Sequence, residues 1–231
     1  MPLTDPARGL LDGGHATIPL NAKGIEALAE LRTQAARFFT QDEKTKLRHG
    51  GDDFNFGYRP YGRQYSVSPD RPDMNSSFVY RADDPTAIPY HKADTIAPFL
   101  TALGAYWRVA AAIADQVLAG LASHYGYRGD LQFRIETDAQ MRQAAVGAGR
   151  LLVMPGSVLT AMTDGQIPPL YHQVRNHGLK RCITTLFMVN PGLNGNVIPY
   201  TGGAVDIAAL ARTSGSMFGL PPAPVPAPPT A

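Results

Sequence analysis

The sequence predicts an α+β domain, with helices in its first part and β-strands in its second part. Apolar residues recur at helical spacing in two early segments, whereas short alternating or continuous apolar runs follow Gly129. The chain has 231 residues, of which 44% are hydrophobic and 17% charged, so it is long enough to bury a core of its own. We expect one domain over residues 1–220, followed by a tail over residues 221–231.

The first predicted helix covers Asn21 to Phe39. Its apolar residues recur on one helical face while charged residues occupy the other, which is the pattern of an amphipathic helix. The apolar residues are Ile25, Leu28, Leu31 and Phe38. Shortly after this helix, Lys44 and Lys46 are expected to be solvated charges at a helix end.

A loop and a second helix follow. The segment from Gly50 to Pro72 is rich in Gly, Pro, Tyr and Asp, so we expect it to be irregular and accessible at the surface. Ordered loops of this kind often carry binding residues. Pro98 then marks the start of a long helix that extends to about Ser123, with Trp107 as one of its core residues.

The predicted strands lie in the second half of the chain. Apolar residues alternate with polar ones at Leu131, Phe133 and Ile135, and continuous apolar runs cover Leu151–Met154 and Thr184–Val189. The tail contains the run PPAPVPAPP, which cannot form a helix or a strand ladder and should be extended.

Composition and charge narrow the class of partner. Lys and Arg number 21 against 19 Asp and Glu, a net charge of +2, and no basic run stands out. This argues against nucleic-acid binding or a membrane anchor and favours a small-molecule substrate. Cys182 is the only cysteine and no leader segment is apparent, so we expect the cytoplasm. The apolar stretch from Val109 to Leu121 contains Asp115 and Gln116, and no transmembrane span is expected. The oligomeric state is left open.

The segment from Gly149 to Pro191 carries the most informative pattern. In chain order it contains Pro155-Gly156, Thr163-Asp164-Gly165, His172 with Val174, Arg181, and Asn190-Pro191. This order resembles the C-terminal half of the isopenicillin-N-synthase-like family of iron(II) and 2-oxoglutarate-dependent dioxygenases. Earlier segments resemble that family as well: TQAARFFTQDEKTKL, FGYRPYGRQYS followed by PDMNSSFVY, YWRVAAAIADQVLAGLA and DLQFRIETDAQMRQAAVGAG.

The resemblance implies a fold and an activity. The implied fold is a double-stranded β-helix, or jelly roll, with residues 1–129 as its helical and loop part and residues 130–220 as the C-terminal part of the barrel. The implied activity is hydroxylation, desaturation or cyclisation of a small organic molecule. It would use Fe(II), O2 and 2-oxoglutarate, and it would convert 2-oxoglutarate to succinate.

The resemblance also implies roles for individual residues. By this resemblance His172 corresponds to one of the family's iron ligands. Iron sites of this kind use a small number of protein ligands on one face of the metal and leave the other positions open. Arg181 would bind the far carboxylate of 2-oxoglutarate, since a guanidinium can pair a carboxylate with two hydrogen bonds. The family usually has Ser or Thr two residues later, where this chain has Ile183. A β-bulge near Cys182 would turn Thr184 toward the pocket in its place.

A further group of residues is implied to contact the substrate, since the corresponding family segment lines the mouth of the pocket. These residues are Tyr58, Arg59, Tyr61, Arg63 and Tyr65. Their mixture of cations and phenols suggests a carboxylated or amino-acid-like substrate.

The chain departs from the family in two ways. None of its histidines is followed two positions later by Asp or Glu, so the His-x-Asp/Glu motif that supplies the other iron ligands is absent. The long helix and the strand at Leu131 are also too close in sequence to hold several barrel strands. Because an incomplete barrel leaves open edges, we hypothesise that a segment is missing between about Gly126 and Leu131.

These departures leave two other functions open. One is a metal-free barrel remnant that acts as a small-molecule binding or interaction protein. The other is a relative of the family that does not use 2-oxoglutarate. Loss of Arg181 would distinguish the second from a 2-oxoglutarate-dependent enzyme.

Overall fold

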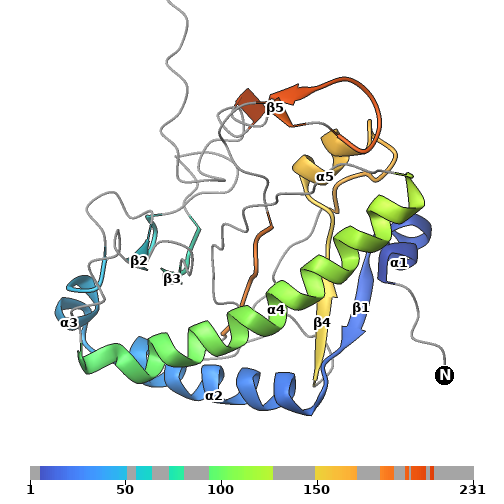
Figure 1. Cartoon of the computed structure of the whole chain (residues 1–231). Coiled ribbons are helices and arrows are strands. Elements are labelled where there is room, and N and C mark those ends of the chain that lie inside the picture. Colours follow the sequence, from blue (N-terminus) through green and yellow to red (C-terminus); the bar gives the residue numbers. More distant parts are fainter. Residues whose placement is uncertain are drawn as a thin grey trace, which may run out of the picture.

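The computed structural model of the chain consists of helices packed against short antiparallel strand pairs (Figure 1). It describes residues 6–50, 56–63, 73–80, 94–126, 149–170, 183–189, 196–197, 199–206 and 209–210. The elements in chain order are α1 Pro6–Gly13, β1 Ala16–Pro19, α2 Ala22–Phe39, α3 Glu43–Leu47, β2 Gly57–Arg59, β3 Ser77–Val79, the 3-10 turn η2 Asp94–Ile96, α4 Ala97–His124, β4 Arg150–Val153, α5 Ser157–Met162, β5 Asn196–Val197 and β6 Val205–Asp206.

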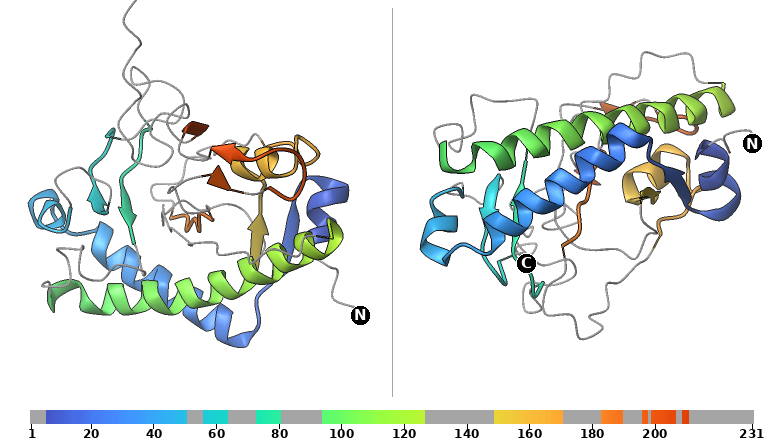
Figure 2. Two further views of the ribbon diagram at one scale, coloured as in Figure 1. Left: turned by 45° about the horizontal axis from the view of Figure 1, so that its top comes forward. Right: turned by 90° about the horizontal axis from the view of Figure 1, so that it is seen from below.

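Helices α2 and α4 pack side by side and run in opposite directions along the molecule (Figures 1 and 2). Helix α2 begins after Asn21, whose side-chain oxygen accepts a hydrogen bond from the Gly24 backbone N–H at 2.9 Å. Helix α4 has Pro98 in its first turn, where the missing N–H of proline leaves no helical hydrogen bond unmade. Both helices confirm the segments predicted from apolar periodicity.

Three strand pairs lie on one side of this helix layer. β1 pairs with β4, β2 with β3, and β5 with β6, each antiparallel. In Figures 1 and 2 the β1–β4 pair lies near α1, the β2–β3 pair lies near α3, and residues 183–189 run between them. Strand β4 confirms the prediction for the apolar run that begins at Leu151.

Two clusters of buried side chains form the core, and α4 contributes to both. The first core contains Leu31, Ala35, Phe38, Tyr58, Phe78, Ile96, Phe99, Ala102, Leu103, Tyr106 and Ala110. The second core contains Ala7, Leu10, Ala16, Val117, Leu121, Ala122, Val158, Met162, Ile167 and Tyr200. Phe38 is central to the first core: its ring stacks on that of Phe99 at 5.0 Å and meets that of Phe78 edge-on at 5.1 Å.

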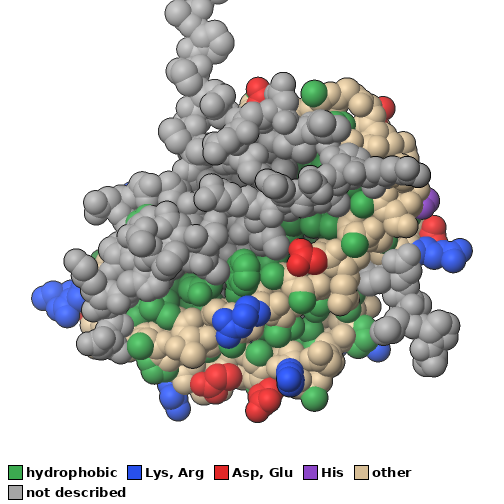
Figure 3. Space-filling model, in the orientation of Figure 1, with side chains coloured by type: hydrophobic (Ala, Val, Ile, Leu, Met, Phe, Trp, Pro, Cys, Tyr) green, Lys and Arg blue, Asp and Glu red, His purple; other side chains and the backbone are tan. Residues whose placement is uncertain are grey.

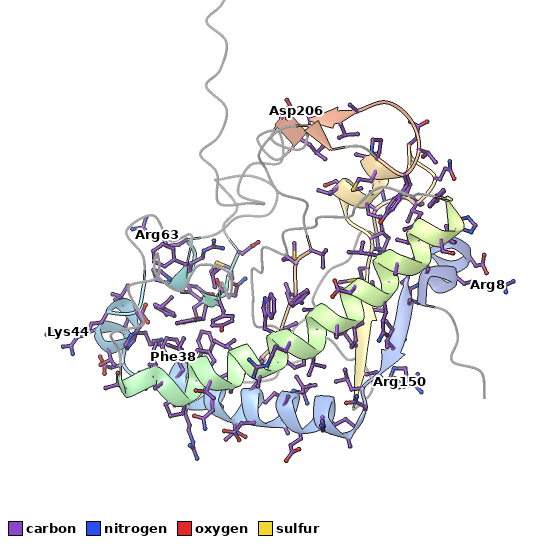
Figure 4. The ribbon with its side chains drawn as sticks, in the orientation of Figure 1. Arg8, Phe38, Lys44, Arg63, Arg150 and Asp206 are labelled. Atoms are coloured by element: carbon purple, nitrogen blue, oxygen red, sulfur yellow. The ribbon has the colours of Figure 1, made fainter. Side chains whose placement is uncertain are left out.

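Most charged side chains on the visible face of the molecule lie at its rim. In Figure 3 they stand along the lower rim, over α2 and near α1 and α3, with a few over α4, while hydrophobic side chains gather above the first half of α4. Figure 4 shows how single residues point. Arg8, Lys44 and Arg150 point outward, whereas Phe38 points into the molecule.

The described residues form three two-stranded pairs and no closed barrel. They correct two expectations about strands. Residues 183–189, predicted as a strand, form none, because within the described part of the chain no strand pairs with them. The loop expected over residues 50–72 contains a buried strand, β2, since Tyr58 packs into the first core. The strand predicted at residues 131–135 and the proline-rich tail lie outside the described residues.

Helix α4 closely matches the segment predicted for it, from Pro98 to about Ser123. Its 28 residues are long and apolar enough to cross a membrane, judged by length and composition alone. Its buried residues are divided between the first and the second core. A core helix of a globular domain meets the same length and composition test.

Candidate functional site

The β2–β3 pair forms a ribbon with two different faces. Tyr58 and Phe78 lie opposite each other in register, and both belong to the first core. Side chains alternate between the faces of a strand, so their neighbours Arg59 and Ser77, which are also opposite each other, point to the other face. The ribbon therefore presents an aromatic face to the helices and a polar face away from them.

The aromatic face is tied to helix α3 by a polar cluster. The Tyr58 hydroxyl donates to the Glu43 carboxylate, with 3.0 Å to each oxygen, and Lys46 Nζ lies 2.9 Å from Glu43 Oε2. The Lys46 ammonium also lies 5.1 Å from the centre of the Tyr58 ring. Lys46 is thus buried, which corrects the expectation of a solvated charge. Tyr58, implied by the resemblance to contact the substrate, is located in the core and is 1% exposed.

The charges in this cluster stabilise one another. The hydrogen bond from Lys46, more than the opposing effect of burial, lowers the pKa of Glu43. Burial acts against the charge on Lys46, but its hydrogen bonds to Glu43 and Tyr58 outweigh burial and raise its pKa. Burial raises the pKa of Tyr58. At neutral pH the cluster therefore contains an ammonium, a carboxylate and a neutral phenol that donates to the carboxylate.

His49 lies beside this cluster, at the point where the chain meets β2. It is 6% exposed, and its Nδ1 has no hydrogen-bond partner among the described residues. The ring lies 6.0 Å from that of Phe38, and burial lowers the pKa of His49. The His49 carbonyl accepts from the Tyr58 N–H at 2.9 Å, an approach that requires a glycine at position 57, where φ is +70°.

The polar face of the ribbon is buried as well. Arg59 is 7% exposed and Ser77 is 2% exposed. Within the part of the chain that the structure describes, the Ser77 hydroxyl has no hydrogen-bond partner. Arg59 has interactions of its own within the protein.

Two of the other residues implied to contact the substrate follow β2 at the end of the ribbon. Tyr61 is 60% exposed and Arg63 is exposed, and the Gly62 N–H donates to the Asn75 carbonyl at 3.3 Å, which holds this end beside the start of β3. Figure 4 shows Arg63 at the upper end of the ribbon. Tyr65 lies outside the described residues.

Residues 183–189 run past the first core as a straight stretch (Figure 1). Ile183 and Phe187 pack against the first core. Thr184 is 6% exposed, and its hydroxyl has no hydrogen-bond partner among the described residues. Phe187 lies 6.1 Å from the half-buried ring of Trp107, at a small apolar pocket.

The elements that lead to His172 follow the order implied by the resemblance. Strand β4 ends before Pro155, helix α5 follows, and Thr163 starts a turn whose next residue, Asp164, has a positive φ of 49°. The Thr163 hydroxyl accepts from the Ile167 N–H at 3.2 Å and fixes this turn. The Leu170 N–H then donates to the Pro155 carbonyl at 3.0 Å, which returns the chain to the end of β4.

The implied iron ligand and the implied carboxylate-binding arginine are not described. His172, Arg181 and Cys182 lie outside the described residues, so the structure does not test their roles. In the described ranges, no group of three or more His, Cys, Asp or Glu side chains is arranged to hold a metal ion. The described residues alone therefore do not assemble an iron site.

Sequence reasoning missed three polar residues at this site: Glu43, His49 and Ser77. Glu43 lies in TQAARFFTQDEKTKL and Ser77 lies in PDMNSSFVY, two segments that resemble the family, but neither resemblance marks these residues individually. No pattern in the sequence marks His49. Their importance comes from contact with β2, which the local sequence does not reveal.

The fold is similar to that of several solved structures, two of which are described below. A Caulobacter crescentus protein of the 2OG-Fe(II) oxygenase family matches with a TM-score of 0.65 and 15% identity, over 90% of this chain and 92% of that chain. A full-length Neurospora crassa protein in complex with alpha-KG matches with a TM-score of 0.61 and 14% identity, over 82% of this chain and 80% of that chain. No family model and no curated protein matches the sequence.

These matches support the oxygenase fold predicted from the sequence. They do not distinguish the isopenicillin-N-synthase-like subfamily from other members of that fold. At this identity they establish similarity of fold alone, and activity does not follow from fold by itself.

Proposed function

We propose that the protein is an Fe(II)- and 2-oxoglutarate-dependent oxygenase of the isopenicillin-N-synthase-like type, acting on a small organic molecule. The observation that carries the proposal is the similarity to a 2OG-Fe(II) oxygenase family protein over nine-tenths of both chains. The order of strand, turn, helix and turn before His172 supports it independently. When bound, iron and 2-oxoglutarate would supply the oxygen activation, and 2-oxoglutarate would be converted to succinate.

Among the described residues, Thr184 is the one that we propose binds a carboxylate of 2-oxoglutarate. Its buried hydroxyl lacks a partner among the described residues, so it can donate to a carboxylate. Arg181 precedes it by three residues and would supply the guanidinium that pairs with the same carboxylate. The proposed site for the co-substrate thus combines Arg181 and Thr184.

The proposed iron site rests on His172. The other ligands are not assigned, because the sequence has no His-x-Asp/Glu motif and the described residues contain no suitable cluster. Leu170, two residues before His172, is held at the end of β4 by its bond to Pro155. This anchoring would fix where the histidine enters the site.

The substrate would enter by the β2–β3 ribbon. Arg59, Tyr61, Arg63 and Tyr65 are proposed to contact it, while Tyr58 holds the strand in place through its hydroxyl on Glu43. The aromatic side chains of the first core exclude water from the inner face of the ribbon, where the Tyr58 hydroxyl donates to Glu43. We further propose that the protein acts in the cytoplasm, without nucleic acid or membrane partners.

The proposal is tested by measuring succinate formed from 2-oxoglutarate by the full chain in air, with Fe(II) and with ascorbate as reductant. We expect formation that requires Fe(II), is lost in His172→Ala, and is lost in Arg181→Gln. Thr184→Val should raise the KM for 2-oxoglutarate by about tenfold, since it removes one hydrogen bond to a charged group. Thr185→Val changes the next residue, which lines the small apolar pocket beside Trp107, and is the matched control that should leave this KM unchanged.

Each alternative function gives a different result in this assay. Oxygen consumption that persists without 2-oxoglutarate and in Arg181→Gln would identify a relative that does not use this co-substrate. Binding of small molecules with no succinate formation under any condition would identify a metal-free binding protein. Either result would overturn the proposal.

A further inference from the structure

A small apolar pocket lies where helices α2 and α4 meet residues 183–189. Leu31 of α2, Leu103 of α4 and residues 185–187 all line it. Aromatic side chains complete the lining, among them Trp107 and Phe187, whose ring centres lie 6.1 Å apart. The pocket is therefore built from segments that are far apart in the sequence and that meet only in the folded chain.

The pocket has room for one small molecule. The space open to the centre of a water-sized molecule is about 10 Å³. This corresponds to about one such molecule, so an aromatic ring or an amino acid does not fit unless the lining moves. Folded interiors are packed about as densely as organic crystals, and a space of this size beside the first core is a distinct feature.

The lining selects against water and in favour of an apolar occupant. Nearly all of the surface of the pocket is contributed by apolar atoms. A buried water needs about two to four polar partners, which this surface does not supply. A small apolar molecule needs no such partners and gains dispersion contacts with the surrounding side chains. Apolar cavities in proteins accordingly remain dry and take up apolar molecules such as xenon.

The pocket adjoins the segment to which we assign the co-substrate. Thr185 and Leu186 line the pocket, and they directly follow Thr184, which we propose binds 2-oxoglutarate. An oxygenase consumes one small apolar molecule as a reactant, and that molecule is dioxygen. Dioxygen has two atoms and no charge, and it dissolves better in apolar surroundings than in water. Its size and polarity therefore match the pocket.

We propose that this pocket binds dioxygen and holds it close to the site where the oxygenase consumes it. The inference rests on the proposed oxygenase function, which gives the protein a use for the gas. Binding is reversible and changes no bond, because the occupant is held by dispersion contacts alone. The lining residues thereby acquire a role in supplying the reactant, which none of the sequence motifs indicates.

The test uses the paramagnetism of dioxygen, which speeds the nuclear relaxation of methyl groups near it. Relaxation of the leucine methyl groups is measured in the full chain, free of iron and 2-oxoglutarate, under oxygen and under nitrogen at the same pressure. Leu103 and Leu121 form a matched pair: both lie on α4 and are 3% and 0% exposed, and of the two only Leu103 lines the pocket. We expect a clearly larger effect of oxygen on Leu103 than on Leu121.

Two changes assign the excess relaxation at Leu103 to the pocket. Leu186→Phe places a larger side chain in the lining and should abolish the excess, whereas Thr185→Val keeps the shape of the side chain and should retain it. Xenon added to the unmodified chain should compete for the same space and reduce the excess. The xenon experiment needs no substitution, so it decides the matter where Leu186→Phe impairs folding.

Three results would overturn the proposal. The first is an equal effect of oxygen on Leu103 and Leu121, which would show that the gas only dissolves throughout the interior. The second is no effect on either residue. The third is an excess at Leu103 that persists in the presence of xenon. Because no turnover is measured, loss of the proposed oxygenase activity would leave each of these readings unchanged, and the two failures are distinguishable.

Discussion

Tyr58 shows how one side chain can position a strand. Its ring lies in the first core, 5.9 Å from the ring of Phe38, and its hydroxyl reaches Glu43 on α3. Tyr58→Phe keeps the ring and removes only the hydroxyl, so the lost hydrogen bond to a charged group should cost about 1–2 kcal/mol of unfolding free energy. Urea unfolding at neutral pH measures this difference.

Tyr61→Phe is the control for this change. The Tyr61 ring is 60% exposed, so removing its hydroxyl should alter the unfolding free energy by less than about 0.5 kcal/mol. Equal effects of the two substitutions would show that the Glu43 contact contributes nothing to stability. In that case the ribbon would depend on its aromatic packing alone.

His49 gives the protein a dependence of stability on pH. Burial lowers its pKa in the folded state below the ordinary value of 6.5, so the unfolded state binds the proton more readily. Stability should therefore be complete at pH 8 and should fall as the pH drops below about 6.5. In His49→Phe this loss should be smaller, as measured by urea unfolding at pH 8, 6.5 and 5.5. An unchanged slope in the variant would exclude His49 as its source.

Lys46 illustrates the limit of sequence reasoning at this scale. In the sequence it is one of several charges after a helix, and nothing nearby marks it as buried. Its burial depends on Tyr58, which is brought beside the Glu43–Lys46 pair across a separation of 15 residues from Glu43. Contacts of this range depend on how elements pack, and local patterns do not contain that information.

At the scale of elements, two glycines in the β2 region are held in the same backbone conformation for different reasons. Gly57 has φ of +70° and Gly62 has φ of +73°. A Cβ at Gly57 would overlap the His49 carbonyl oxygen, whereas a Cβ at Gly62 would meet nothing within 4 Å. Gly62→Ala should cost only the backbone penalty of about 1 kcal/mol. Gly57→Ala should cost clearly more, because it also separates β2 from His49.

Urea unfolding of the two variants isolates the close approach. The backbone conformation is matched, so the difference in their unfolding free energies reports the clash at His49. If both variants lose the same stability, the contact between His49 and β2 is loose. The strand would then not be positioned by it.

The long helices were predictable and the short strands were not. Over the 18 residues of α2 and the 28 of α4, a repeated apolar stripe is unambiguous. Strand β2 has three residues, too few for any periodicity, and it is buried because of Tyr58. Residues 183–189 have the apolar composition of a strand, but they pack by side chains against the first core without a described partner strand.

At the scale of the molecule, α4 joins two cores and thereby links the ribbon to the β1–β4 pair. The similarity to the Caulobacter crescentus protein covers almost equal shares of the two chains, so the chains are nearly the same length. The hypothesis of a segment missing after Gly126 was based on the longer family pattern, and residues 127–148 lie outside the described ones.

The parts of the candidate site that lie in short motifs of the expected order could be predicted from the sequence. The sequence identified Arg59, Thr184 and the elements before His172, since these depend on short segments with recognisable residues. It did not identify Ser77, because one serine before an apolar pair has no special meaning until the register places it opposite Arg59. The remaining iron ligands stay unassigned in sequence and structure alike.

The measurement that tests the account most directly is calorimetric titration of 2-oxoglutarate into the full chain, with and without Mn(II) as a stable substitute for Fe(II). We predict a single binding site that requires the metal and is weakened in Thr184→Val. No binding, or binding of equal strength without the metal, would contradict an iron-dependent oxygenase.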